Sequence, residues 1–106
     1  MKYYVLFYDV VDDYLERRAP FREEHLNLVQ RLYEQGAILL GGALADPADR
    51  VLIVFHTENT DVIDDFIHRD PYVKNGLVAG WKVRPWTVVI GNVADGKIGE
   101  GETLIQ

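Results

Sequence analysis

The sequence predicts an α+β domain of the ferredoxin-like type, with its elements in the order strand, helix, strand, strand, helix, strand (βαββαβ) and an antiparallel sheet. Three observations support this prediction. Four segments are rich in apolar, β-branched and aromatic residues. Two others repeat apolar residues at helical spacing, and 106 residues suffice for one domain.

The first strand and the first helix are the clearest elements. Residues Lys2–Tyr8 are almost all aromatic or β-branched, and Asp9 closes the run. Residues 10–19 are polar, and we interpret them as a loop or a loose helical turn. Pro20 suits the first turn of the helix that follows, and Gly36 is expected to end that helix.

A hairpin is predicted in the middle of the chain. Residues Ala37–Leu44 form an apolar run that contains two glycines, which fits a buried strand. Residues 45–50 (ADPADR) have turn composition, and Val51–Phe55 is the next strand. The short connection makes these two strands antiparallel partners.

The second helix and the last strand complete the pattern. The second helix can be capped at its N-terminus by Thr57, Asn59 or Thr60. Pro71 is expected to end it at about Asp70. Trp81–Ile90 is predicted to be the last strand, irregular near Pro85. We therefore assign residues 1–90 to the domain and 91–106 to an acidic, glycine-rich tail that packs on a partner subunit or stays loose.

Two helices cover only one face of such a sheet, yet both faces of the first strand are apolar. Tyr3, Val5 and Phe7 alternate with other apolar side chains, and the second strand is apolar throughout. An uncovered second face would expose a larger apolar patch than soluble monomers usually carry. The sequence therefore predicts a homodimer that packs sheet on sheet as a dimeric α+β barrel, with a cleft for a small-molecule ligand.

Composition excludes several classes of function. The net charge of −6 argues against nucleic acid and anionic membranes as partners. The chain has no cysteine, which rules out disulfides and thiolate chemistry, and no serine nucleophile or nucleotide-binding glycine pattern is present. Without a signal sequence or a transmembrane run, we place the protein in the cytoplasm by default.

His25 is the first candidate for chemistry, because it falls in the apolar stripe of the first helix. A half-buried imidazole can serve as a general acid or base if a carboxylate fixes its tautomer, and Asp70 is the natural carboxylate. The alternatives are ordinary: His25 can simply pack in the core, and an aspartate before Pro71 is a good N-cap.

Substrate contacts are predicted at Arg22, Tyr72 and Trp81. Arg22 stands one helical turn before His25, where it can hold a carboxylate or phenolate, or lie solvated on the surface. The two aromatic residues suit a flat or quinone-like ligand, although aromatic residues on strands are mostly core. His68 with His25 and Asp70 makes only a weak metal set, so no metal site is predicted.

The motifs resemble those of the YCII-related family. They are Arg22-x-x-His25-Leu26, the segment 36–42 (GAILLGG), and Asp70-Pro71-Tyr72-Val73, within a resemblance from Tyr3 to about Val89. The resemblance implies a ferredoxin-like fold, a dimeric α+β barrel and a His–Asp pair in a cleft, which falls on His25 and Asp70 with Arg22 as the arginine. One activity associated with the family is dehydrochlorination of a chlorinated hydroxyquinol.

These observations lead to one main hypothesis and two alternatives. The main hypothesis is a small cofactor-independent acid/base enzyme, a lyase, dehydrochlorinase or isomerase, that acts on a cyclic or aromatic metabolite through His25 and Asp70. The first alternative is a non-catalytic dimeric module that binds a small molecule in the same cleft. The second is a monooxygenase free of haem and metal.

Overall fold

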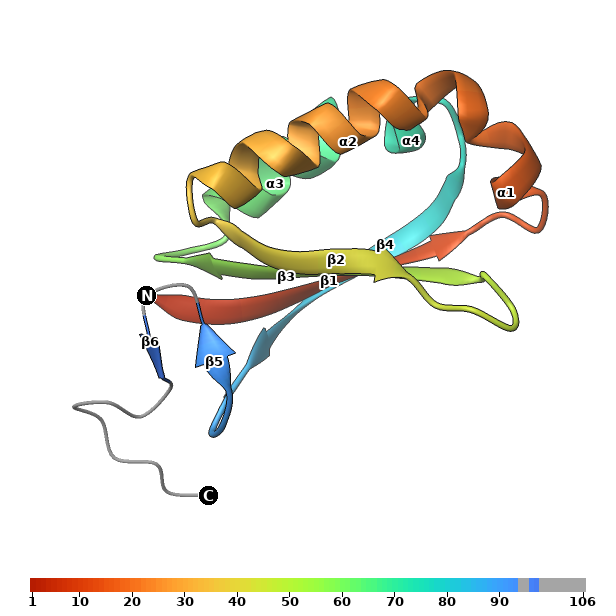
Figure 1. The fold of residues 1–106 in the computed structure, drawn as a ribbon. Coiled ribbons are helices and arrows are strands. Elements are labelled where there is room, and N and C mark those ends of the chain that lie inside the picture. The colour runs from red at the N-terminus through yellow and green to blue at the C-terminus, as the bar shows by residue number, and fades with distance from the viewer. Residues whose placement is uncertain (94–95, 98–106) are drawn as a thin grey trace.

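The computed structural model describes residues 1–93 and 96–97 (Figure 1). The main sheet contains four antiparallel strands in the order β2-β3-β1-β4, namely β1 (Lys2–Val10), β2 (Ile38–Ala43), β3 (Arg50–Thr57) and β4 (Val78–Trp86). The helices are α1 (Tyr14–Arg17), α2 (Ala19–Glu34), α3 (Asp61–Arg69) and α4 (Pro71–Lys74). The predicted ferredoxin-like α+β fold is confirmed.

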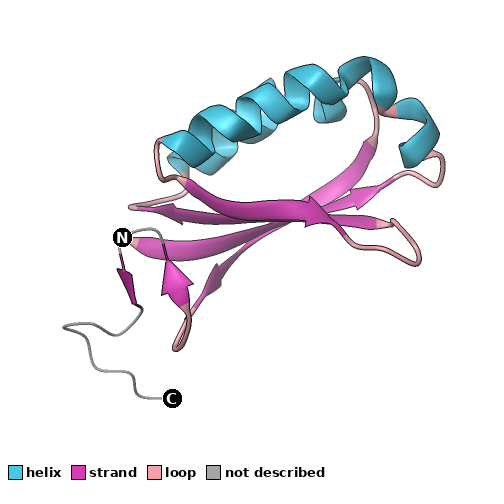
Figure 2. Cartoon of the chain, in the orientation of Figure 1, coloured by secondary structure: helices cyan, strands magenta, loops and turns pink. Residues whose placement is uncertain are grey.

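All four helices lie on one face of this sheet (Figure 2). The inward face of β1 carries Tyr4, Leu6 and Tyr8, which are buried beneath α2, α3 and α4. Ile53 and Phe55 of β3 join them from the neighbouring strand, because residues in register share a face. The core formed by the described residues therefore lies between the sheet and the helices, and the candidate site adjoins it.

The ends of the elements refine the sequence predictions. Residues 10–19 contain the one-turn helix α1, which agrees with a loose helical turn. Helix α2 begins at Ala19, and Gly36 follows its C-cap with φ +81°, the left-handed conformation expected of a glycine that ends a helix. Before α3, the Asn59 side chain accepts the hydrogen bond of the Asp61 N–H at 2.9 Å.

The prediction for the last strand was wrong in its limits. Strand β4 spans Val78–Trp86 and not 81–90, because it pairs along β1 from Val10 opposite Val78 to Tyr3 opposite Trp86. Strand β1 begins at Lys2, so beyond the pair of Tyr3 and Trp86 it offers only one more residue for β4 to pair with. The break in the pairing register of β4 lies opposite Asp9 and Val10, and not at Pro85. Strand β4 is at the edge of the sheet, so the missing N–H of Pro85 can face the side that has no neighbouring strand.

The chain beyond residue 90 is described only in part. Two short strands, β5 (Asn92–Val93) and β6 (Gly96–Lys97), form a separate two-stranded antiparallel sheet. The remainder of the predicted tail, residues 94–95 and 98–106, lies outside the described residues. The division into a domain of 1–90 and a tail of 91–106 stays a prediction.

The face of the main sheet opposite the helices is apolar, as the alternation in β1 predicts. An open groove crosses it, lined largely by apolar side chains: Val5, Phe7, Leu40, Leu52, Val54, Pro85 and Trp86. Leu40 is 64% exposed and Trp86 is 49% exposed. Exposed apolar side chains gathered on one face are typical of a protein interaction surface. Among the described residues, no helix has the length and apolar character needed to cross a membrane.

Candidate active site

Helix α2 turns His25 toward the core. Phe21 stands one turn before it and Leu28 and Val29 one turn after, and these three side chains pack partly buried against the core cluster. The His25 residue is only 6% exposed, although most of the helix is polar. A polar ring in this position is stable only when its nitrogens find partners or reach a cavity.

Asp70 is placed by the junction between two helices. It ends α3 in an extended conformation (φ −68°, ψ 119°) and caps α4, whose first residue is Pro71. Its Oδ1 accepts the backbone N–H of Tyr72 at 3.0 Å, the bond expected of an N-cap. The capping role predicted from the Asp-Pro dipeptide is therefore real, and the residue is fully buried.

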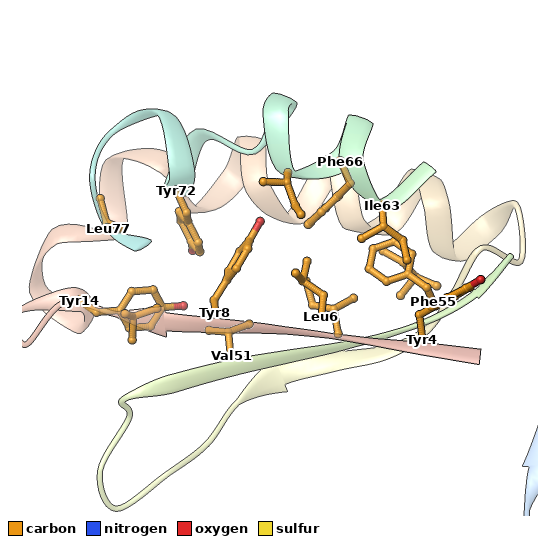
Figure 3. Packing of buried hydrophobic residues seen from close by; sticks show 14 residues of the cluster. Tyr4, Leu6, Tyr8, Tyr14, Val51, Phe55, Ile63, Phe66, Tyr72 and Leu77 are labelled. Atoms are coloured by element: carbon orange, nitrogen blue, oxygen red, sulfur yellow. The ribbon is translucent and has the colours of Figure 1, made fainter. Parts of the chain in front are cut away.

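Three donors converge on this carboxylate. Nδ1 of His25 lies 2.8 Å from Oδ1 of Asp70, and the Tyr8 hydroxyl donates to Oδ2 at 2.7 Å. The Tyr72 N–H supplies the third bond. Figure 3 shows the Tyr8 ring rising from β1 so that its hydroxyl points toward the helices. The network ties one strand and two helices together and satisfies both oxygens of Asp70 without solvent.

This arrangement selects one tautomer of His25. An ionised carboxylate can only accept hydrogen bonds, so the proton of the neutral imidazole belongs on Nδ1, facing Asp70. No side-chain hydrogen bond among the described residues uses Nε2, and His25 lines a cavity. The lone pair of Nε2 is then available to a ligand in that cavity.

The Tyr72 ring packs against one face of the His25 imidazole. The two rings stack with their centroids 3.9 Å apart and 11° between their planes, and Tyr14 meets Tyr72 edge to face at 5.7 Å. Burial, and then the neighbouring Tyr14 phenol, raise the pKa of Tyr72 to about 12, while Arg22 and Arg18 act in the opposite direction. Burial beside Asp70 also raises the pKa of Tyr8 far above its usual value.

A cavity of about 170 Å³ opens beside His25, between α2 and the β2 edge of the sheet. It has room for a single six-membered ring, since a cavity of roughly 150 Å³ holds benzene. Gly41 and Gly42 of β2 form part of its wall, and a Cβ added at Gly41 would meet Ile53 Cγ1 at 3.3 Å. Arg22 and Tyr72, both predicted substrate contacts, line this cavity together with His25.

Trp81 stands apart from this group. It lies on β4 opposite Tyr8, is 50% exposed and is not among the residues that line the cavity. The order of the sheet explains the separation, because β4 and β2 are at opposite edges while the cavity adjoins β2. The predicted role of Trp81 in substrate binding therefore finds no support from its position.

The other two histidines, His56 and His68, contact residues outside the cavity. His68 Nδ1 lies 2.7 Å from the Asp64 carbonyl oxygen in its own helix, and His56 stacks on Tyr3 across β1 and β3. Within residues 1–93 and 96–97, no group of three or more His, Asp or Glu side chains could hold a metal ion.

Sequence reasoning missed three residues of the site. Tyr8 was expected as one of the aromatic residues that line a sheet face or cleft, with no link to Asp70, and Arg18 and Tyr14 were assigned to the polar loop. In the structure, Tyr8 donates to Asp70 and the other two residues line the cavity. A signal was present for Arg18. The spacing of Arg18, Arg22 and His25 is i, i+4, i+7, which places all three on one face of a helix.

Comparisons with known proteins agree with this fold. The sequence profile of the YCII-related domain matches residues 1–87. An uncharacterised protein of Haemophilus influenzae is 30% identical over 96 residues, which cover 82% of this chain and 98% of that protein.

Two solved structures show the same fold. The 5-chloro-2-hydroxyhydroquinone dehydrochlorinase of Burkholderia phenoliruptrix AC1100, in complex with 2,5-dihydroxybenzoquinone, superposes with a TM-score of 0.68 at 20% identity, covering 80% of this chain and 93% of that one. An antibiotic biosynthesis monooxygenase superposes with a TM-score of 0.54 at 14% identity, covering 84% and 99%. Likeness at these identities establishes the architecture only.

Proposed function

The chain belongs to the YCII-related domain family, and from this premise we propose that it is a small acid/base enzyme, independent of cofactors, acting on a cyclic or aromatic metabolite. The observation that carries the proposal is the buried 2.8 Å contact between His25 Nδ1 and Asp70 Oδ1. An imidazole fixed by a carboxylate at one nitrogen and open to a cavity at the other is suited to proton transfer near neutral pH.

In the proposed reaction, Nε2 of His25 takes a proton from a carbon or hydroxyl of the bound ring. The imidazolium that results has both nitrogens protonated, and Asp70 stabilises its charge across the existing Nδ1–H bond. Tyr8 and the Tyr72 N–H hold the carboxylate in place, so it does not need to reorient as charge develops.

The type of reaction depends on where the electron pair of the broken C–H or O–H bond goes. In dehydrochlorination of a chlorinated hydroxyquinol, the imidazolium first returns a hydroxyl proton to the chlorine-bearing ring carbon. Loss of a second hydroxyl proton to His25 then forms a C=O bond, and chloride leaves with the electron pair of the C–Cl bond. In an isomerisation, the imidazolium returns the proton to a different atom of the ring. Both routes need one proton-transferring group and no change of oxidation state by an external reagent, which suits a site with one histidine.

The size of the cavity favours a substrate with one ring. About 170 Å³ accommodates a monocyclic compound and little more. The dehydrochlorinase that shares this fold was solved with the monocyclic 2,5-dihydroxybenzoquinone. A chlorinated hydroxyquinol is therefore the first substrate class to assay, followed by related non-chlorinated rings.

The decisive experiment measures chloride release from 5-chloro-2-hydroxyhydroquinone, with a panel of monocyclic quinols as further substrates. We expect His25→Gln and Asp70→Asn to lower kcat by at least about 100-fold, the usual contribution of a general acid or base. His68→Gln is the matched control, because that exposed histidine bonds only its own helix and should leave the rate unchanged.

The competing hypothesis is a non-catalytic module that binds the same ligands. It predicts saturable binding of a ring compound with no turnover by the unaltered protein. Turnover that survives in both His25→Gln and Asp70→Asn would overturn the proposed mechanism. A monooxygenase would consume oxygen with a quinol substrate, and an oxygen electrode should detect no consumption if the acid/base proposal is correct.

A further inference from the structure

The cavity beside His25 carries two arginines along one wall. Arg18 occupies the N-cap position of α2, where its side chain makes no capping hydrogen bond, and Arg22 stands one turn further along the same face. In the part of the chain that the structure describes, neither arginine forms an ion pair with a carboxylate, and none of the lining residues is acidic. A chain with a net charge of −6 thus places unpaired positive charge at this cavity.

Arg18 is also held in place. Its guanidinium carbon lies 5.3 Å from the centroid of the Tyr14 ring, and that ring meets Tyr72 edge to face. A cation packed on an aromatic face loses side-chain freedom before a ligand arrives, which lowers the entropic cost of binding. Arg22 is exposed at the surface, so it can adjust to the ligand.

The Tyr72 hydroxyl adds a hydrogen-bond donor without a partner. Tyr72 is 1% exposed and lines the cavity, and its hydroxyl forms no hydrogen bond of good geometry among the described residues, although the Tyr14 phenol lies near enough to raise its pKa. A buried polar group in this state costs folding free energy, and such groups concentrate where a ligand supplies the missing bond. With a pKa raised to about 12, this phenol stays protonated near neutral pH and can donate.

We propose that Arg18, Arg22 and the Tyr72 hydroxyl form an oxyanion subsite, and that the ligand of this cavity is a single ring bearing a carboxylate or phenolate oxygen. The inference rests on the proposed function for the choice of site and adds the charge class of the substrate. Two guanidinium groups and one phenol are hydrogen-bond donors of the kind that such an oxygen group accepts. The volume of about 170 Å³ sets the limit of one ring.

The subsite also orients the ligand for chemistry. A ring held by its oxyanion at the arginines would lie beside the stacked rings of Tyr72 and His25, with a neighbouring ring atom toward Nε2. Negative charge that spreads onto the oxyanion after proton removal would meet the same donors. Binding and charge stabilisation would then use one set of groups.

The test compares two probes of the same shape and different charge. Benzoate and benzamide are titrated into the purified full-length protein at neutral pH by isothermal calorimetry, and amide NMR shifts report the location. We expect saturable benzoate binding that perturbs the amides of α2 and α4, with benzamide at least tenfold weaker. Titration with 4-nitrophenolate shows whether a phenolate is accepted as well as a carboxylate.

Three variants locate the effect. Arg18→Gln, Arg22→Gln and Tyr72→Phe should each weaken benzoate binding, by about tenfold for the arginines and less for the hydroxyl, and leave benzamide unchanged. Arg31→Gln removes the same charge from the exposed last turn of α2 and should have no effect. Tyr72→Phe deletes a hydroxyl that bonds no described residue, so its fold should be retained even if Arg18→Gln disturbs Tyr14.

The outcomes separate this inference from the proposed function. Equal binding of benzoate and benzamide, no saturable binding of benzoate at millimolar concentration, or the same loss in Arg31→Gln as in Arg22→Gln would overturn the oxyanion subsite. None of these results depends on turnover. Conversely, benzoate selectivity in an unaltered protein that turns over none of the quinol substrates would support the subsite while the enzyme proposal fails.

Discussion

The imidazole of His25 and the phenol ring of Tyr72 stack in parallel at 3.9 Å, and the backbone N–H of Tyr72 bonds the same carboxylate oxygen that His25 contacts. One residue of the short helix α4 therefore positions both members of the pair, His25 through its ring and Asp70 through its backbone. The Asp-Pro-Tyr order of residues 70–72 makes this possible, because Pro71 at the start of α4 fixes the turn between carboxylate and ring.

This double contact predicts a split in the kinetics of two Tyr72 variants. Tyr72→Phe keeps the ring and the backbone bond but loses the hydroxyl of the proposed subsite, so KM for an anionic substrate should rise and kcat should fall less than in a variant without the ring. Tyr72→Leu keeps only the backbone bond, and the loss of an aromatic pair worth about 0.5–1.5 kcal/mol should loosen the imidazole and lower kcat several-fold. Equal kcat values for the two variants, measured with the proteins folded in circular dichroism, would contradict a positioning role for the stack.

The bond from Tyr8 to Asp70 should contribute measurably to stability. Tyr8→Phe leaves one oxygen of a fully buried carboxylate without a partner, which should lower the free energy of unfolding by about 1–3 kcal/mol in urea titration. Tyr4→Phe is the matched control on the same strand and the same buried face, where no side-chain hydrogen bond to a described residue would be lost. If the two variants were equally stable, the Tyr8 hydroxyl would add nothing beyond packing.

Stability should fall at high pH because of Tyr8. Its pKa is raised in the folded state by burial and by Asp70, so the folded protein keeps a proton that the unfolded chain releases near 10.0. The corresponding stability is fully present below pH 10 and is lost as the pH rises above it, by up to about 1.4 kcal/mol per pH unit for one group. Tyr72 adds in the same direction.

The measurement is urea unfolding at intervals from pH 8 to pH 12. The slope of the unfolding free energy above pH 10 should be shallower in Tyr8→Phe than in the unaltered protein, whatever the starting stability of the variant. Parallel curves would show that Tyr8 ionises as readily in the folded protein as in the unfolded chain.

The fold could be predicted from the sequence because its signals are local. Alternation in residues 2–8 and the apolar stripe around His25 each depend on the period of one element, and both were confirmed. The limits of β4 could not be predicted in this way. They depend on which residues of β1 remain to be paired, a long-range property that the run from Trp81 to Ile90 does not contain.

The same distinction applies to the site. His25 and Asp70 were marked by local oddities, a histidine in an apolar stripe and an acid before a proline, and the structure brings them within 2.8 Å. Tyr8 has no unusual local pattern, because tyrosines are common in strands. Its role depends on the fold, which places Asp70 within hydrogen-bond distance of its hydroxyl. The position of Trp81 away from the cavity could not be predicted, since aromatic character alone does not tell which edge of the sheet a strand takes.

The apolar face of the sheet leads to the last prediction, the homodimer. Val5 and Val54 pair on this face and are already buried, while Leu40 and Trp86 in the same groove are 64% and 49% exposed. The described helices all lie on the other side of the sheet (Figure 1). A second copy packed sheet on sheet would remove this surface from water. We expect the unaltered protein to sediment as a dimer at micromolar concentration in analytical ultracentrifugation.

A charge on that face should break the dimer. Leu52→Glu would place a carboxylate without a partner in the interface of each subunit, and we expect the dimer to weaken by at least tenfold, because an unpaired buried charge costs several kcal/mol. Val62→Glu on α3 is the control, since this 37% exposed residue belongs to the helical layer and should leave the dimer intact. A monomeric unaltered protein, or a Leu52→Glu variant that sediments like Val62→Glu, would show that the sheet face is not the interface.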